Sequence, residues 1–103
     1  MVLFVGIENE EGDQIDAVWE LEFLPKRLAC YVNSVCLRFI DPHGDTSFNQ
    51  LQLPVLQIEL QDLLADSELA VAERKEAERL LAACRKAGEK KRHYLVFYAD
   101  TGE

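Results

Sequence analysis

The first 25 residues contain no lysine or arginine, although they carry seven acidic side chains. Over the whole chain, 19 acidic residues stand against 11 basic ones, and the formal net charge is -8. An acidic surface repels nucleic acid and anionic membranes, and it accelerates the encounter with a basic protein. We therefore expect a basic protein as the partner and no binding to nucleic acid or membrane.

A long apolar run is also missing. The N-terminus reads MVLFVGIENE, and its apolar run of seven residues has no basic segment before it. Such a run is shorter than the core of a signal peptide and far too short to cross a bilayer. We therefore expect the protein to stay in the cytoplasm.

Cysteine and histidine are too scarce for a metal site. The cysteines Cys30, Cys36 and Cys84 form no CxxC pair and lie in apolar surroundings, and the histidines are His43 and His93. A structural zinc site needs four ligands at compact spacing. An odd number of dispersed cysteines indicates reduced, buried thiols. The sequence thus predicts no metal and no catalytic cysteine.

The five glycines form neither a dinucleotide-binding fingerprint nor a P-loop, so we expect no nucleotide or other cofactor. With 49% hydrophobic and 29% charged residues, the composition is that of an ordinary globular protein. A chain of 103 residues without linkers or repeats builds one hydrophobic core. Residues 1–103 are therefore expected to form a single domain.

Apolar runs and alternation predict four strands. The clearest is IDAVWELEF, residues 15–23, in which one face is apolar and the other mostly acidic. A turn with Gly12 at positive φ joins it to the preceding strand. The other strands are expected at residues 2–8, 35–40 and 93–99. The apolar row expected to face the core at residues 15–23 consists of Ile15, Ala17, Trp19, Leu21 and Phe23.

Two helices are expected between the last two strands. The first begins near Pro54, and its wide apolar arc includes Val55 and Ile58, which predicts a largely buried helix. The second covers residues 67–87, with Asp66 or Ser67 as N-cap and Gly88 ending it in the left-handed conformation. Its apolar line is narrow, so we expect it on the outside. That line consists of Ala77, Leu80, Leu81 and Cys84.

The order β-β-β-α-α-β predicts an α+β fold. We expect a four-stranded, mainly antiparallel sheet with two helices packed on one face. The other face would then expose half of the first and last strands, a patch large enough to need a cover. A homodimer, another partner, residues 26–34 or the C-terminal tail would provide it. The two sets of side chains that could lie there are Tyr94, Val96 and Tyr98, or Leu95, Phe97 and Ala99.

Residues 41–49, DPHGDTSFN, are predicted in the first place to form a corner between a strand and a helix. A proline ends the strand and a glycine supplies the turn. Ser47 and Gln50 match the capping box S-x-x-Q, in which each side chain bonds the backbone of the other residue. Because Pro54 cannot donate to residue 50, we expect one short turn near residues 48–52 before the main helix.

The same loop carries the candidate site. Its polar side chains alternate as in a calcium loop, but the glycine comes too early and position 52 lacks the bidentate glutamate. A histidine between two carboxylates has the chemistry of a general acid or base, although no nucleophile is visible beside it. The loop could equally be a recognition surface or only a structural corner. The candidate residues are Asp41, His43, Asp45, Ser47 and Asn49.

Asp16, Glu20 and Glu22 are expected on one face of the strand at residues 15–23, at spacings of about 7 to 13 Å. Carboxylates at such spacings permit acid/base chemistry, but a solvated acidic face explains them more simply. The basic run at residues 85–93 leaves a similar choice between a phosphate contact and cations that stabilise a helix C-terminus. We expect the three acidic residues to form a solvated face and the basic run to stabilise the helix C-terminus.

The segments GDTSFNQLQ, PVLQIELQDLL and YLVFYAD together resemble a group of short bacterial proteins of uncharacterised function. Those proteins carry a similar G-D-T-x-F-N-x-x-Q corner before a leucine-rich helix. The resemblance implies a bacterial origin. It implies no activity or substrate, so it assigns no role to the matching residues, which are Gly44, Asp45, Thr46, Phe48, Asn49 and Gln52.

The sequence favours a small acidic protein–protein interaction module that binds a basic partner, for example an immunity protein that neutralises a toxin. Acidic side chains on a rigid sheet would steer association with a cationic surface. The first alternative is a small-ligand-binding or enzymatic domain that uses the loop at residues 41–49. The second is a homodimeric structural subunit. Because the sequence shows no nucleophile beside the histidine and no cofactor motif, we expect no catalytic residues and no enzyme.

Overall fold

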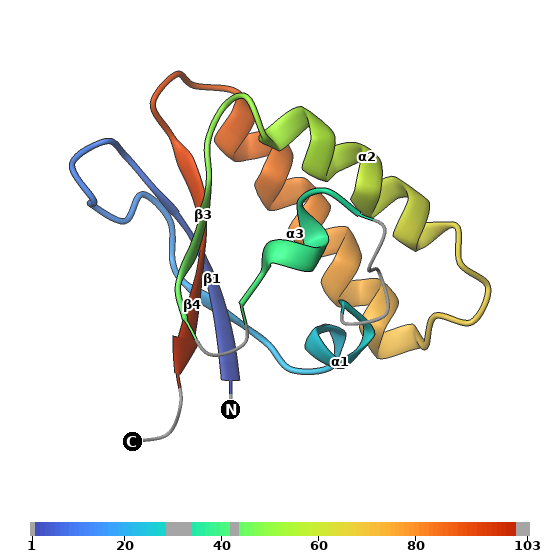
Figure 1. The fold of residues 1–103 in the computed structure, drawn as a ribbon. Helices are drawn as coiled ribbons and strands as arrows, with labels where there is room; N and C mark the ends of the chain where they lie inside the picture. Colours follow the sequence, from blue (N-terminus) through green and yellow to red (C-terminus); the bar gives the residue numbers. More distant parts are fainter. Residues whose placement is uncertain (1, 29–33, 42–43, 101–103) are drawn as a thin grey trace.

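The protein folds into two layers, a sheet and the helices that cover one of its faces (Figure 1). The computed structural model describes residues 2–28, 34–41 and 44–100. Along the chain the elements are β1 (Val2–Glu8), β2 (Trp19–Leu21), α1 (Leu24–Leu28), the 3-10 helix η1 (Leu37–Phe39), β3 (Thr46–Phe48), α2 (Leu53–Leu64), α3 (Val71–Gly88) and β4 (Tyr94–Asp100).

The sheet has the strand order β2-β1-β4-β3, and all neighbouring strands are antiparallel. Its central strands, β1 and β4, pair along seven residues, from Val2 opposite Asp100 to Glu8 opposite Tyr94. The edge strands β2 and β3 are only three residues long. The expected α+β fold, with a four-stranded antiparallel sheet and two main helices, is confirmed.

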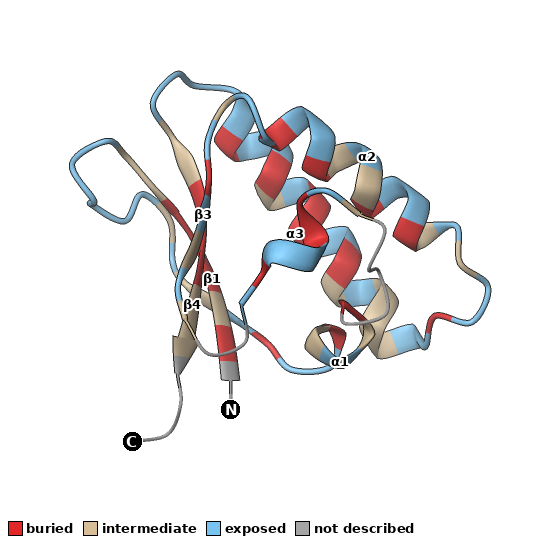
Figure 2. Ribbon diagram, in the orientation of Figure 1, coloured by how far each residue is buried: buried red, intermediate tan, exposed pale blue. Residues whose placement is uncertain are grey.

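The core fills the space between the sheet and the helices (Figure 2). Alternate residues of β1 and β4, such as Val5 and its partner Phe97, are fully buried. The ring of Phe97 meets the ring of Phe48 from β3 edge-on, with 5.8 Å between the centroids. Leucines at helical spacing on α2 close the core from the other side. They are Leu53, Leu56, Leu60 and Leu63.

The two main helices differ from the expected burial. α3 buries its apolar line as predicted, yet it contacts α1, α2, β1 and β4, so its predicted place on the outside is wrong. α2 leaves Val55 37% and Ile58 59% exposed, because its buried leucines occupy a narrower stripe than the predicted arc. An apolar strip on α2 therefore faces away from the core.

The predicted strand at residues 35–40 is wrong, since this segment forms η1 instead. The reason is a carboxylate on α2: Glu59 accepts hydrogen bonds from the backbone amides of Val35, Cys36 and Leu37. Amides held in this way cannot join a strand ladder. The third strand of the sheet is β3, which lies inside the segment predicted as a corner.

The predicted strand at residues 15–23 is reduced to β2, which pairs with β1 from Trp19 to Leu21. The amide of Ile15 still donates to the carbonyl of Ile7 at 2.8 Å, but residues 16–18 leave the ladder. Consequently Ile15 and Phe23 are 41% and 49% exposed instead of lying in the core. The predicted turn before this segment is confirmed, because Gly12 has a φ of 84°.

The predicted start of α3 is wrong, and so is the predicted left-handed conformation of Gly88 at its end. Asp66 accepts the amide of Glu68 in a turn, and the helix starts later, where the carboxylate of Glu73 accepts the amide of Ala70 at 2.9 Å. Hydrogen bonds from Arg27 and from this amide hold the pKa of the Glu73 carboxyl below its ordinary value. At the other end, Gly88 remains inside the helix without a positive φ.

On the face of the sheet that the helices leave uncovered, side chains of the sheet pack against one another. A Cβ atom at Gly6 would lie 3.1 Å from Val18 and 3.2 Å from Tyr98, so these two side chains lie against the glycine. The Tyr98 hydroxyl donates to the Glu8 carboxylate. The set on this face is Tyr94, Val96 and Tyr98, of which Val96 is buried and the tyrosines are half-buried. This face exposes less apolar surface than predicted, and the homodimer stays a prediction.

Candidate functional site

The loop at residues 41–49 is tied to the sheet by its polar side chains. The amide of Asp41 donates to the Thr46 hydroxyl at 3.0 Å, and this hydroxyl donates to the carbonyl of Phe39 at 3.4 Å. The Asp45 carboxylate accepts the amide of Ala99 from β4 at 3.2 Å. These contacts fix the loop between η1 and β4. Pro42 and His43 lie outside the described residues. The acid/base role considered for His43 therefore stays a prediction.

The end of the loop carries a capping box two residues later than predicted. The amide of Asn49 donates to the Gln52 side chain at 2.9 Å, and the amide of Gln52 donates to the Asn49 side chain at 3.1 Å. The predicted box between Ser47 and Gln50 is wrong, because Ser47 lies within β3 opposite Val96. The short turn expected near residues 48–52 is confirmed by the bond from the Gln52 amide to the Asn49 carbonyl.

Gln50 connects the loop to the far end of α3. Its amide nitrogen Nε2 donates to the carbonyls of Ala87 at 2.9 Å, Lys90 at 2.8 Å and His93 at 3.1 Å. Carbonyls at a helix C-terminus lack partners within the helix, and Gln50 supplies one from another part of the chain. Asp45, Thr46, Asn49 and Gln50 therefore all stabilise the fold.

The predicted acidic face does not form. Asp16 turns toward α3, where its Oδ2 lies 2.6 Å from the Nζ of Lys86. Glu20 is opposite Phe4 in the ladder and points to the open face, and Glu22 follows the end of β2. Asp16 and Glu20 therefore do not share one face of a strand, and the acid/base chemistry considered for the three carboxylates stays a hypothesis.

The basic run at residues 85–93 partly neutralises the acidic N-terminal segment. Besides the pair of Lys86 with Asp16, Arg92 lies 3.2 Å from Glu10. Arg92 also adopts a φ of 64°, in the turn that leads into β4. Two cations of this run thus hold the end of α3 and the turn before β4 against the segment between β1 and β2. The seven acids of residues 1–25 are less available to a partner than their number suggests.

A groove of about 430 Å³ lies between α3 and β1. Charged side chains that line it already contact other lining residues. The Arg79 guanidinium lies 4.4 Å from the Trp19 ring centre, and Lys86 pairs with Asp16. The described residues contain no group of three or more histidine, cysteine or carboxylate side chains placed to hold a metal ion. The charged groups that line the groove are therefore engaged with neighbouring side chains.

Sequence reasoning missed an exposed apolar surface, here named the η1–α2 patch. Its members come from η1 and the residue before its N-cap, and from α2 and the turn that leads into it. Their exposed fractions range from 37% to 86%. The prediction of a strand at residues 35–40 and of a largely buried α2 hid this surface. The patch consists of Val35, Phe39, Leu51, Val55 and Ile58.

The described cysteines are buried free thiols, as predicted. Burial, followed by the nearby charge of Cys36, raises the pKa of Cys84 to about 12. Burial and the Glu59 carboxylate raise the pKa of Cys36. Since the thiolate is the nucleophile, both thiols are chemically inert in the folded protein. Cys30 lies outside the described residues.

In a Cys30→Ser background, we expect iodoacetamide to alkylate Cys36 and Cys84 at least about 100-fold more slowly at about pH 8 in the native protein than in urea. The expected difference follows from the small thiolate fraction and from burial. Mass spectrometry of timed samples measures both rates. Native alkylation at the rate seen in urea would contradict the burial of these thiols.

Among the described residues, no helix combines the length and the apolar character needed to cross a membrane. The resemblance of residues 44–52 to a group of short bacterial proteins stays a prediction. Comparisons of the chain with family models, with curated proteins and with solved structures found no match.

Proposed function

We propose that this protein is a protein–protein interaction module whose partner is a basic protein. The observation that supports the proposal is the arrangement of charge along the chain. Residues 1–25 and 39–73 together hold 14 of the 19 acidic residues and no lysine or arginine. All 11 basic residues are confined to residues 26–38 and 74–92. Such segregation favours association with a cationic surface.

The two acidic segments contribute differently. In residues 1–25, Glu10 and Asp16 already form ion pairs with Arg92 and Lys86. In residues 39–73, Glu73 pairs with Arg27, whereas Asp45 and Glu59 accept backbone amides, and bonds of this second kind leave the negative charge in place. Ion pairing with a lysine or arginine cancels most of the distant field of a carboxylate, whereas a bond to a neutral amide does not. The second segment therefore supports the proposal more strongly.

A toxin-neutralising immunity protein of the bacterial cytoplasm is the concrete form of this proposal. Free thiols at Cys36 and Cys84 support a reducing compartment. The small size of the chain, its single core and its acidic charge support a role as a stoichiometric inhibitor that blocks a cationic active site. The same features suit any adaptor with a basic partner.

Affinity capture with the full chain tests the proposal. We expect a basic protein to be retained at about 50 mM salt, and its purified form to associate at least about tenfold more slowly at about 300 mM salt. Stopped-flow measurement of the association and dissociation rates separates electrostatic steering from short-range contacts. Capture of acidic or neutral proteins only, or an association rate indifferent to salt, would overturn the proposal.

A further inference from the structure

We propose that the η1–α2 patch is the docking surface for a basic amphipathic helix of the partner. This inference rests on the proposed function, because it takes a basic protein as the partner. It adds the place of contact and the kind of segment that binds there.

One half of the patch is a stripe along α2 and the turn that leads into it. Leu51, Val55 and Ile58 follow one another at intervals of four and three residues, which places them on one side of a helix. Their side chains are 86%, 37% and 59% exposed. Asp62, four residues after Ile58, continues the stripe with an exposed carboxylate. An apolar stripe that ends in an acidic group suits a partner with an apolar face and a cation at its edge.

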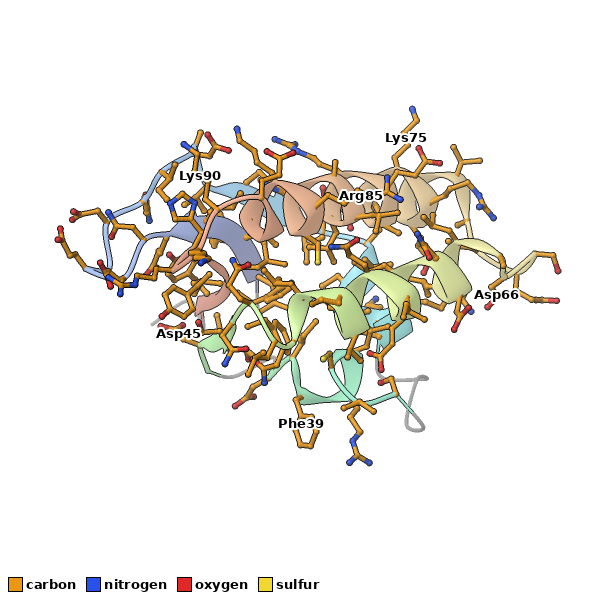
Figure 3. All side chains as sticks on the ribbon, turned by 90° about the horizontal axis from the view of Figure 1, so that it is seen from above. Phe39, Asp45, Asp66, Lys75, Arg85 and Lys90 are labelled. Atoms are coloured by element: carbon orange, nitrogen blue, oxygen red, sulfur yellow. The ribbon has the colours of Figure 1, made fainter. Side chains whose placement is uncertain are left out.

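The other half comes from the segment of η1, which Glu59 holds against α2. The Glu59 carboxylate accepts the amides of Cys36 and Leu37 at 2.9 Å each, and it also accepts the amide of Val35. This contact leaves Val35 61% and Phe39 58% exposed. Figure 3 shows Phe39 pointing away from the protein, beyond η1 and on the side of α2 opposite α3.

The two halves are adjacent and their arrangement is fixed. Glu59 and Val55 are separated by one helical turn of α2, so the segment bonded to Glu59 lies beside the exposed side chain of Val55. The Cys36 thiol reaches the carbonyl of Gln52 at 3.8 Å, one turn earlier on the same side. An apolar surface held by several hydrogen bonds requires little reorganisation on binding.

The charge around the patch decides between the candidate occupants. Residues 39–73, which include the α2 half of the patch, hold seven acidic residues and no lysine or arginine. Arg38 of η1 lies 4.7 Å from the Phe39 ring centre, so one cation stands at the η1 edge of the patch. A second copy of this chain would bring the same acidic segment and another net charge of -8 against it. A helix with lysine or arginine beside its apolar face avoids this repulsion.

The helical form of the partner follows from the shape of the surface. The spacing of Leu51, Val55 and Ile58 complements apolar residues at i, i+3, i+4 and i+7 on another helix. The long stems of lysine and arginine can lie along the edge of the patch while their charged ends reach the carboxylates. Asp62 at one end of the stripe provides such a carboxylate.

A synthetic amphipathic helical peptide of leucine and lysine serves as the probe. We expect it to shift the amide resonances of residues 35–39 and 51–62 in the full chain. A peptide of the same composition in scrambled order, and one with glutamate in place of lysine, are expected to bind at least about tenfold more weakly. Isothermal titration gives the three dissociation constants.

Paired variants test the surface itself. Leu51→Ser combined with Ile58→Ser removes two exposed contacts and is expected to weaken binding of the leucine–lysine peptide at least about tenfold with unchanged thermal stability. Val71→Ser is the matched control, since Val71 is 73% exposed at the start of α3 and lies outside the patch. It is expected to bind the peptide as the unmodified protein does.

The results distinguish this inference from the proposed function. Shifts confined to residues 9–22, with normal binding by the double variant, would overturn the docking surface and leave a basic partner in place. Equal binding of the scrambled peptide would also overturn it. A dimer in sedimentation that the double variant abolishes would assign the patch to a second copy. Failure of all basic peptides and all basic proteins to bind would overturn both.

Discussion

Replacing Gln50 with glutamate is expected to lower the free energy of unfolding by about 3 kcal/mol, which corresponds to a fall in Tm of roughly 15 °C. The Gln50 amide group donates to three carbonyl oxygens, those of Ala87, Lys90 and His93. A carboxylate in this place has no hydrogen to donate and faces three negative dipole ends. Chemical unfolding followed by circular dichroism measures the loss.

The Gln50→Glu defect should depend on pH. Desolvation and the three carbonyl dipoles raise the folded-state pKa of the introduced carboxyl above its unfolded value. The part of the destabilisation that comes from ionisation is therefore complete above the folded-state pKa and disappears as the pH falls below the unfolded value, while the loss of one donor hydrogen remains. Gln61→Glu, the same exchange at an exposed position of α2, should change stability by less than about 0.5 kcal/mol at any pH. Equal effects of the two exchanges would contradict the bonding of Gln50.

Glu76→Ala is expected to cost about 2 to 3 kcal/mol. The Glu76 carboxylate accepts the backbone amides of Glu22 at 2.8 Å, Phe23 at 2.9 Å and Leu24 at 2.8 Å. These amides mark the end of β2 and the start of α1. Two of them reach water once the carboxylate is gone, whereas the amide of Leu24 is partly buried, so the cost is less than that of three charged hydrogen bonds.

A local measurement identifies the cause of the Glu76→Ala effect. Hydrogen exchange at the amides of Phe23 and Leu24 should accelerate under conditions in which the centre of β4 stays protected. Glu78→Ala, at an exposed position two residues further along α3, is the control and should leave both stability and exchange nearly unchanged. Uniform acceleration of exchange throughout the protein would contradict a local role for Glu76.

The periodicity of apolar residues was sufficient to predict most of the fold. The leucines of α2 repeat at helical spacing, and the residues of β4 are apolar on both faces, so both elements were predicted within about two residues. Carboxylates on the helices explain the misplaced strand and the early end of the shortened one, but not the loss of the ladder at residues 16–18. At residues 22–24 and 35–37 the backbone amides are bound by Glu76 and Glu59, so they do not extend the sheet.

Contacts between a side chain and a distant backbone leave no signal in a single sequence. Local spacing can relate Glu76 only to residues within a helical turn or so, such as Arg79, whereas its partners in the structure are more than 50 residues away. The same holds for Gln50, whose match to a capping box was a coincidence of spacing. The corner itself was recognised, and the correct box of Asn49 with Gln52 could have been found by testing asparagine as well as serine as the cap.

The central strands of the sheet, β1 and β4, are the first and the last elements described along the chain. During synthesis, β1 therefore cannot pair fully with β4 until residue 100 has left the ribosome. Until then the helices can form but have no complete surface to pack on, because α3 lies against both strands. Folding of this domain should thus be completed only after β4 has emerged, and a chain arrested before β4 should expose its leucine-rich helices to chaperones.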